Sequence, residues 1–187
     1  VFKSGWQVNG TKSANGTVVT NELNSSGNLV ITLQGALTVN RDVTIDGSFL
    51  PAGEAGKVVP NTVSIQMAGN VADRIFYIKN DEANRVETVA LYNLQLSGGR
   101  ANGVGTAAAS SGGAIFAVAN LTLGNVSISS SQAGNGGYGG GVYLEGGVLT
   151  MNDVTVQNCT ALYGGGVYIK GSNLGQVQLL ANNVSLI

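Results

Sequence analysis

Apolar residues alternate with small polar residues over short runs of this chain, and the runs recur in a fixed order along its second half. A period of two is typical of a β-strand with one buried face, and no run shows the spacing of an amphipathic helix. The recurring pairs of runs are residues 121–123 and 125–128, 149–151 and 153–156, and 177–179 and 183–186. The pattern therefore predicts short strands in a repeated unit.

A glycine cluster begins each unit. The clusters read Gly-Gly-Ala-Ile-Phe at 112–116 and Gly-Gly-Gly-Val-Tyr at 139–143 and 164–168, which places them 27 and 25 residues apart. Self-similarity at such a period is typical of repeats that stack and bury a shared core. Three short strands per unit, each pairing with its equivalent in the next unit, predict an all-β parallel β-helix of about 25–30 residues per turn. The usual handedness of parallel crossovers predicts a right-handed helix.

Less regular runs in the first half fit the same unit. Residues 29–33, 37–39 and 43–45 would be three strands of one turn, and residues 63–65, 74–78 and 91–96 would be the strands of the next. The chain is thus expected to form one elongated domain, 1–187. Its predicted parts are a cap or entry segment at 1–28, irregular turns at 29–100 with a loop at 48–61, and regular glycine-rich turns at 101–187.

The composition supports stacked strands. Glycine, with 29 copies, provides the backbone angles that tight corners need, while both prolines, Pro51 and Pro60, fall in the predicted loop. Charged residues make up only 10% of the chain, and those at 81–87 are expected in a solvated loop. A charge repeated in every turn would lie close to its own copy and repel it, whereas small polar residues avoid that penalty.

Charge and cysteine content disfavour several classes of function. The net charge is −1 with no basic cluster, which argues against a nucleic-acid partner. No segment is apolar over the roughly 18 residues that predict a membrane-spanning helix. Cys159 is the only cysteine, so no intrachain disulfide is possible. Its expected state is a small half-buried thiol, with pairing between chains as the alternative.

Acid–base chemistry has few candidates in this chain, which contains no histidine. In the second half, from residue 101 onward, the charged residues are Glu145, Asp153 and Lys170. Enzymes that cleave polysaccharides on a β-helix need clustered carboxylates, often with basic residues beside them. Asp42 and Asp46, next to Arg41, are the best such group, although two turn residues at the ends of a strand explain them as well. No enzymatic activity, cofactor or metal is expected.

A column of asparagines precedes the same strand in successive units. Its members are Asn93, Asn125, Asp153 and Asn183. Stacked in register, their side-chain amides can bond to the copies above and below, as in an asparagine ladder. An ionised carboxylate accepts hydrogen bonds but cannot donate them, so Asp153 is expected to interrupt the ladder.

Aromatic residues also recur at equivalent positions. Phe116, Tyr143 and Tyr168 end the three glycine-led motifs, and Tyr138 and Tyr163 each precede a cluster. If the branched residue before each ring points inward, alternation turns the rings outward. These five residues could then form a platform for sugar rings or a partner surface. The alternative is that the stacked rings simply shield the strand backbones and one another.

The two ends of the chain suggest association. Ile187 lies inside a predicted strand, where the pattern calls for another glycine cluster, so either the chain continues or another molecule docks there. The opening segment carries Phe2 and Trp6, which could cap their own stack or insert against the open end of a neighbour. The second arrangement would give a head-to-tail fibre. The residues expected at that contact are Phe2, Trp6, Val184, Leu186 and Ile187.

Seven Asn-x-Ser/Thr triplets match the acceptor for N-glycosylation. They begin at Asn9, Asn15, Asn24, Asn120, Asn125, Asn158 and Asn183. Because the chain is rich in Asn, Ser and Thr, most matches are expected to arise from strand and turn composition. The triplets at Asn125 and Asn183 belong to the predicted ladder.

The repeated motifs resemble those of a known group. Gly-Gly-Ala-Ile at 112–115 and Gly-Gly-Gly-Val at 139–142 and 164–167 are similar to the repeats of chlamydial polymorphic membrane proteins. They resemble more broadly the β-helix repeats of bacterial surface proteins such as autotransporter passengers and adhesins. The resemblance covers about residues 90–187. It implies secretion, surface display and an adhesive or scaffolding role, and it carries over no catalytic residue.

The favoured function is therefore that of a non-enzymatic, extracellular or cell-surface structural protein, such as a stalk, fibre subunit or adhesin segment. Its expected partners are further copies of itself, a glycan, or a host or cell-surface molecule. The alternative is a β-helix that binds or cleaves polysaccharide. That alternative requires Asp42 and Asp46 to converge with basic residues, or the tyrosine column to be exposed.

Overall fold

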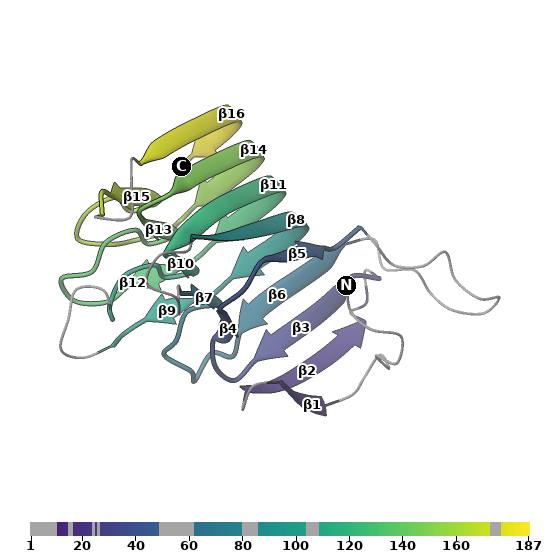
Figure 1. Ribbon diagram of the computed structural model, residues 1–187. Coiled ribbons are helices and arrows are strands. Elements are labelled where there is room, and N and C mark those ends of the chain that lie inside the picture. The colour runs from purple at the N-terminus through teal and green to yellow at the C-terminus, as the bar shows by residue number, and fades with distance from the viewer. Residues whose placement is uncertain are drawn as a thin grey trace.

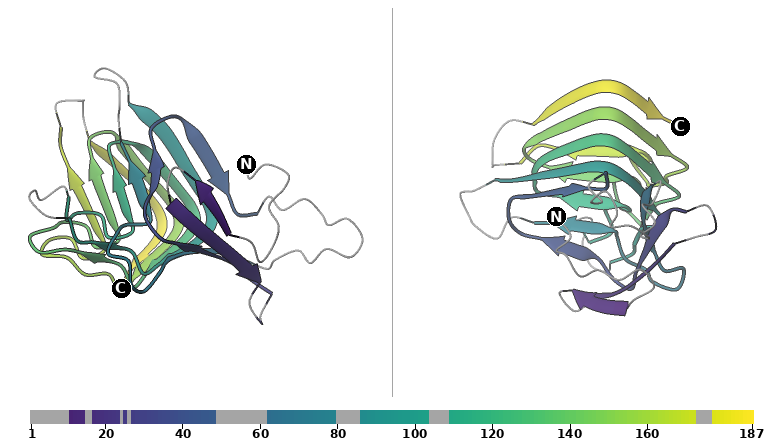
Figure 2. Two further views of the ribbon diagram at one scale, coloured as in Figure 1. Left: turned by 90° about the horizontal axis from the view of Figure 1, so that it is seen from below. Right: turned by 90° about the vertical axis from the view of Figure 1, so that its right-hand side faces the viewer.

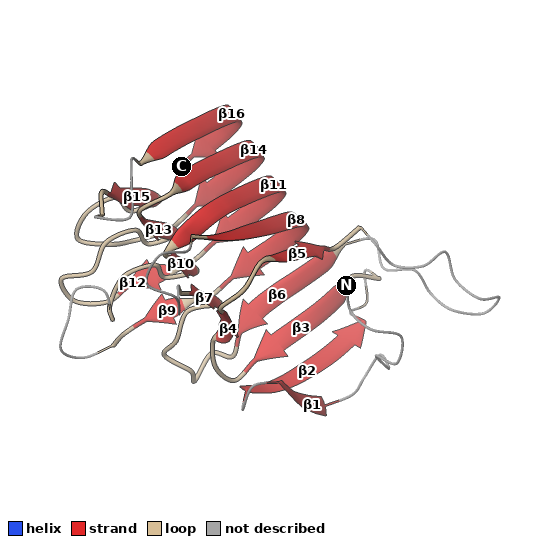
Figure 3. Cartoon of the chain, in the orientation of Figure 1, coloured by secondary structure: helices blue, strands red, loops and turns tan. Residues whose placement is uncertain are grey.

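The computed structural model is built from β-strands. It describes residues 11–14, 17–23, 25, 27–48, 62–79, 86–103, 109–172 and 177–187. Within these ranges no helix occurs, and the strands are joined by loops and turns (Figure 3). The predicted all-β class is confirmed. No helix in the described ranges has the length and apolar character needed to cross a membrane.

The larger sheet contains nine of the described strands. Eight follow one another in the order β1-β2-β3-β6-β8-β11-β14-β16, and β5 pairs with β8 beside β6. The strands are β1 (Thr11–Ala14), β2 (Thr17–Leu23), β3 (Leu29–Leu33), β5 (Val43–Asp46), β6 (Val63–Met67), β8 (Glu87–Ser97), β11 (Ala119–Ser129), β14 (Val148–Gln157) and β16 (Gln178–Leu186). Figure 1 shows them side by side from β1 to β16.

A second sheet of five short strands has the order β15-β13-β10-β7-β4. Its strands are β4 (Leu37–Val39), β7 (Phe76–Ile78), β10 (Ile115–Ala117), β13 (Val142–Glu145) and β15 (Val167–Lys170). A third, two-stranded sheet pairs β9 (Arg100–Ala101) with β12 (Gln132–Ala133). Every pairing in the second and third sheets is parallel.

Equivalent residues of successive repeats pair with each other in parallel. Leu121 pairs with Val89 on one side and with Leu149 on the other, and Leu149 pairs in turn with Leu179. In the second sheet the three glycine-led motifs are in register, because Ile115 pairs with Val142 and Val142 with Val167. The parallel pairing predicted from the repeats is confirmed.

The two runs predicted after each glycine cluster form one long strand instead of two. β11 and β14 each continue through the position of the asparagine column, where Asn125 has φ 51° and Asp153 has φ 55°. Asn and Asp adopt this left-handed conformation more readily than most residues. The extra residue shifts the alternation. In β8 the buried positions are 87, 89 and 91 before Asn93, and 94 and 96 after it.

The strands predicted for the first half pair in parallel with their predicted counterparts, β3 with β6, β4 with β7 and β5 with β8, but the last run is part of the longer strand β8. Val43 pairs with Val89 at the start of β8, whereas Val63 pairs with Leu94 near its end. β5 and β6 therefore align with the two halves of the long strand β8. Between them the chain leaves the sheet at the position of the asparagine column. The predicted loop at 48–61 falls there, and all of it except Ser48 lies outside the described residues.

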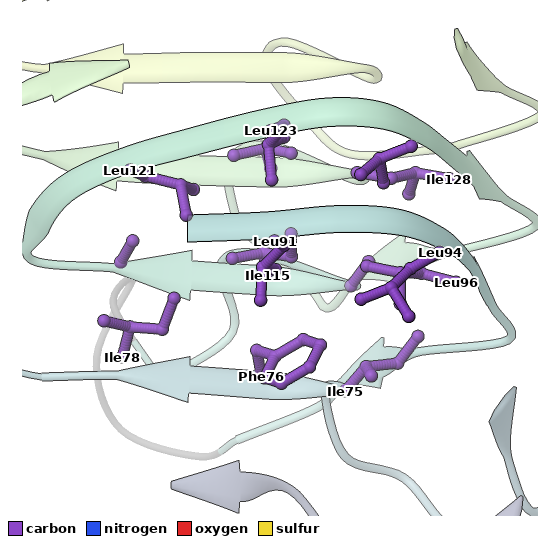
Figure 4. Close-up of a cluster of buried hydrophobic side chains, with 14 of the residues drawn as sticks. Ile75, Phe76, Ile78, Leu91, Leu94, Leu96, Ile115, Leu121, Leu123 and Ile128 are labelled. Carbon is purple, nitrogen blue, oxygen red and sulfur yellow. The ribbon is translucent and has the colours of Figure 1, made fainter. Parts of the chain in front are cut away.

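The core lies between the two main sheets. It consists of inward-facing Leu, Ile, Val, Phe and Met residues together with a few alanines. Figure 4 shows Phe76, Ile115 and Leu91 pointing into the space between the strands. All three are fully buried. Burying this apolar surface is the main source of stability for stacked strands.

Two features of the first half could not be read from the sequence pattern. β1 and β2 form an antiparallel hairpin, and β2 pairs antiparallel with β3 at the edge opposite β16 (Figure 2). Glu87, expected in a solvated loop, is only 1% exposed because it takes the first inward position of β8.

Candidate functional site

Hydrogen bonds join the side chains of the asparagine column. Asn125 Nδ2 donates to Asn93 Oδ1 at 2.8 Å, and Asn93 Nδ2 donates to Asp46 Oδ1 at 2.8 Å. Asp46, which the sequence pattern placed in a possible acidic pair with Asp42, is thus an additional member of the ladder. Each amide donates toward the preceding repeat, so the carboxylate of Asp46 ends the series as an acceptor.

Asp153 divides the ladder into two parts. Asn183 Nδ2 donates to Asp153 Oδ1 at 2.6 Å, which continues the same direction of donation. The next bond in the series would run from residue 153 to Asn125. An ionised carboxylate has no proton to donate, so Asp153 cannot supply it.

Replacing Asp153 with asparagine is expected to stabilise the protein. The new amide can donate to Asn125 while still accepting from Asn183, and asparagine suits the left-handed backbone at this position. One added hydrogen bond contributes about 0.5–1.5 kcal/mol to the free energy of unfolding, measured by urea titration. The gain should disappear in the Asn125→Ala background, which removes the acceptor. A gain that survives there would show that the ladder is not its source.

Asp42 and Asp46, the candidate acidic pair of the first half, bond to different partners. Asp42 Oδ1 accepts from the backbone N–H of Thr88 at 2.8 Å. Asp46 accepts from Asn93 and from the backbone N–H and hydroxyl of Ser48, and these bonds lower the pKa of its carboxyl below 3.8. Because the pKa of Asp46 is lower in the folded state, its carboxylate stabilises the fold fully at pH values above the ordinary pKa. That stabilisation is lost as the pH falls through the lowered pKa.

The predicted aromatic column forms a stack on the second sheet. In register along it lie Tyr77, Phe116, Tyr143 and Tyr168. Successive ring centroids are 5.4, 5.0 and 5.8 Å apart. Tyr77 was not recognised from the sequence because no glycine cluster precedes it. The rings of Tyr143 and Tyr168 are nearly parallel, with an interplanar angle of 2°.

Two of the rings considered for an open platform are buried. Phe116 is 5% exposed and Tyr143 is 3% exposed, although both alternate with core residues and lie outside the core cluster. Loop residues cover them. The ring of Tyr138 lies 6.4 Å from Tyr143 and 4.7 Å from Tyr168, centroid to centroid. Tyr163, which stacks on Tyr138 at 5.4 Å, remains 55% exposed.

Two of the few charged residues of the second half meet beside these rings. Lys170 Nζ lies 2.8 Å from Glu145 Oε1, and the Tyr143 hydroxyl donates to Glu145 Oε2 at 3.1 Å. Burial and the Glu145 carboxylate raise the pKa of Tyr143, which keeps its hydroxyl protonated as a donor. The sequence contained a signal for this ion pair, because Glu145 and Lys170 occupy equivalent positions two residues after Tyr143 and Tyr168.

A buried arginine covers the other end of the aromatic column. The guanidinium carbon of Arg74 lies 4.9 Å from the ring centroid of Tyr77 and 5.1 Å from that of Phe116. Its Nη2 donates to the carbonyl oxygen of Ala109. Burial lowers the pKa of Arg74 from its ordinary value. The contacts with the two rings and the carbonyl compensate for part of the desolvation of this charge.

Replacing Arg74 with alanine is expected to lower the free energy of unfolding by about 2–4 kcal/mol, since it removes a cation–π contact, a charge-assisted hydrogen bond and buried packing. Thermal or urea unfolding measures this change. The matched control is Arg100→Ala, because Arg100 is exposed and its Nη1 lies 3.4 Å from the Gly69 carbonyl oxygen. The control should change stability by less than about 0.5 kcal/mol. Equal effects of the two substitutions would contradict the role given to Arg74.

Cys159 is half-buried, and its Sγ donates to the carbonyl oxygen of Gln157 at 3.3 Å. Burial raises the pKa of its thiol. In the described part of the chain, no three His, Cys, Asp or Glu side chains gather closely enough to hold a metal ion.

The residues expected at an end-to-end contact are only partly described. Phe2 and Trp6 lie outside the described residues. In the last described stretch, Val184 is half-buried, while Leu186 is 58% and Ile187 79% exposed.

The recurring polar and aromatic residues form two contact groups, the amide ladder and the aromatic column with its charged neighbours. Strand β16 in addition exposes Leu179, Leu180 and Leu186. The resemblance to surface β-helix repeats is carried by the glycine-led motifs alone. Comparison with known proteins finds no protein-family model, no curated protein and no solved structure that matches this chain.

Proposed function

We propose that this chain is a right-handed parallel β-helix that acts as a non-enzymatic structural segment of an extracellular or cell-surface protein. A stalk, a fibre subunit or an adhesin segment would have these properties. The main supporting observation is that the recurring amides and aromatic rings contact the equivalent side chains of neighbouring repeats. The amides are joined by hydrogen bonds, and the rings are stacked. Such groups build a scaffold and leave few side chains free for chemistry.

The proposal of a β-helix rests on how the repeats share their strands. Each repeat gives a short strand to the second sheet and a long strand to the larger sheet, as β13 and β14 do in succession. Since long strands of successive repeats are parallel, the chain must return between them, and the short strands lie on that return path. Right-handedness follows the general preference of parallel crossovers.

The spacing of the repeats supports the same arrangement. Asn93 and Asn125 are 32 residues apart, and Asp153 and Asn183 are 30 apart, yet both pairs are joined by direct side-chain hydrogen bonds. Only repeats that advance by a single strand spacing per unit bring such residues into contact. A ladder of this kind adds specificity of register to the apolar core.

Strand β16 is the proposed site of association. Leu179 and Leu186 occupy the inner positions of this strand, yet they are 50% and 58% exposed. Their equivalents in β14, Leu149 and Val156, are at most 1% exposed. A surface that buries core-type residues in one repeat and exposes them in the next suits the addition of further strands, either from a continuation of the chain or from a second molecule.

Sedimentation analysis and electron microscopy test this proposal. Material from the native source is expected to contain elongated particles, and association should weaken in Leu186→Lys. Ser185→Lys is the matched control, because it places the same charge on the outward face of the same strand. A wild-type protein that sediments as a monomer at every concentration would rule out self-association. A globular particle would rule out the scaffold itself.

The alternative of a carbohydrate-binding or carbohydrate-cleaving protein set two requirements. One was an exposed aromatic platform, but Phe116 and Tyr143 are buried. The other was convergence of Asp42 and Asp46 with basic residues, but these carboxylates bond to Thr88 and to Asn93. We therefore favour the structural role.

A further inference from the structure

Tyr138 and Tyr163 are held against each other by their backbones as well as by their rings. The two residues form a parallel β-bridge between loops of successive repeats. Their ring centroids are 5.4 Å apart with an interplanar angle of 15°. The backbone N–H of Gly139 also donates to the Tyr163 carbonyl oxygen at 3.0 Å, which fixes the two loops beside each other. The pair is thus preorganised in van der Waals contact.

The pair is accessible to a reagent in solution. Tyr163 is 55% exposed, whereas Tyr138 is half-buried and touches Tyr168 at a centroid distance of 4.7 Å. An oxidant that reaches Tyr163 therefore meets the outer member of a group of phenols in contact. Two groups held together react far faster with each other than with the same groups on separate molecules.

We propose that Tyr138 and Tyr163 form an oxidative cross-linking site. The co-reactant is a peroxide acting through a haem peroxidase. Each ring loses one electron and one proton to give a phenoxyl radical, and the two radicals join through carbons ortho to their oxygens. The two ring hydrogens then return to the oxygens, restoring both phenols. In sum, two tyrosines and one hydrogen peroxide give one dityrosine and two waters.

The cross-link would join two loops that backbone hydrogen bonds already hold beside each other. It would add a covalent connection between successive repeats of a chain whose single cysteine cannot form an intrachain disulfide. The inference depends on the geometry of Tyr138 and Tyr163 and not on the proposed structural function. It would stand even if the protein proved to be monomeric.

Treatment of the purified protein with horseradish peroxidase and hydrogen peroxide tests the site. Wild type should develop dityrosine fluorescence, and peptide mass spectrometry should show residues 138 and 163 joined with the loss of two hydrogens. Tyr163→Phe should reduce the signal to that of a sample without peroxide. Tyr92→Phe is the matched control, since Tyr92 lies in β8, outside this group of rings, and should leave the signal unchanged.

Mixing isotope-labelled and unlabelled protein before oxidation separates the two possible origins of a cross-link. Coupling within one molecule gives only joined peptides of uniform label, which is the expected result. Joined peptides of mixed label, a Tyr163→Phe variant with undiminished fluorescence, or a bond that maps to Tyr168 would each overturn the assignment. Circular dichroism on every variant verifies that its strands are intact.

Discussion

Replacing Gly113 with alanine is expected to destabilise the protein by about 3 kcal/mol, because the added methyl group overlaps fixed backbone. A Cβ at this position would lie 2.2 Å from the carbonyl oxygen of Gly140 and 2.5 Å from the backbone nitrogen of Gln132. Contacts of Cβ atoms below 3.0 Å essentially do not occur. Neither neighbour is a flexible side chain, so relief requires the two repeats to separate.

The glycines of successive repeats approach one another in the same way. A Cβ on Gly99 would meet the Gly113 carbonyl oxygen at 2.1 Å, and a Cβ on Gly140 would meet that of Gly165 at 2.3 Å. Separation at Gly113 would also strain the hydrogen bond from its N–H to the Gly139 carbonyl oxygen, now 3.1 Å long. The glycine clusters are therefore required for close packing between repeats.

Urea unfolding of Gly113→Ala beside Gly69→Ala measures this effect. Gly69 has no atom within 4 Å of its would-be Cβ and no positive φ, so its substitution should change stability by less than about 0.5 kcal/mol. If the two variants unfold at the same urea concentration, close approach between repeats is not what the glycine clusters provide.

Replacing Phe76 with alanine is expected to lower the free energy of unfolding by about 3–5 kcal/mol, since it opens a cavity in a core that relaxes only partly. Phe76 is fully buried and pairs with Leu37 and Ile115 across the second sheet. It thus contributes to the contact between the irregular first half and the regular repeats. Figure 4 shows its ring among aliphatic side chains, with Ile75 and Ile78 on the same segment.

The conservative variant Phe76→Leu distinguishes cavity formation from any special need for an aromatic ring. Leucine fills most of the volume, so its cost should stay below about 1.5 kcal/mol. Thermal and urea unfolding of the two variants, compared with wild type, give the difference. Equal losses for leucine and alanine would indicate that the ring itself, and not the filled volume, stabilises this position.

Much of the architecture follows from repetition in the sequence. Equivalent residues such as Ile115 and Val142 recur with the same neighbours, and the pairing that satisfies one repeat satisfies the next. The ladder positions Asn93, Asn125 and Asn183 could be located for the same reason. Alternation of apolar and polar residues then determined which side chains face the core.

Alternation could not determine how exposed the outward residues are. Phe116 and Tyr143 point away from the core as expected, but their burial depends on Tyr138 and on neighbouring rings that other segments bring over them. Alternation assigns each ring to one side of its own strand, whereas its burial depends on contacts between repeats and loops that form only after the strands have paired.

The sequence by itself therefore determined the all-β class, the parallel pairing of equivalent strands and the column of asparagines, because a repeated spacing permits only one common register. Only the tertiary structure decided that β5 and β6 together take the place of one long strand, that Asp46 ends the amide ladder, and that Arg74 lies over the rings of Tyr77 and Phe116. These contacts join residues across interruptions and loops of unequal length. Their geometry depends on packing in three dimensions, which a periodic pattern does not encode.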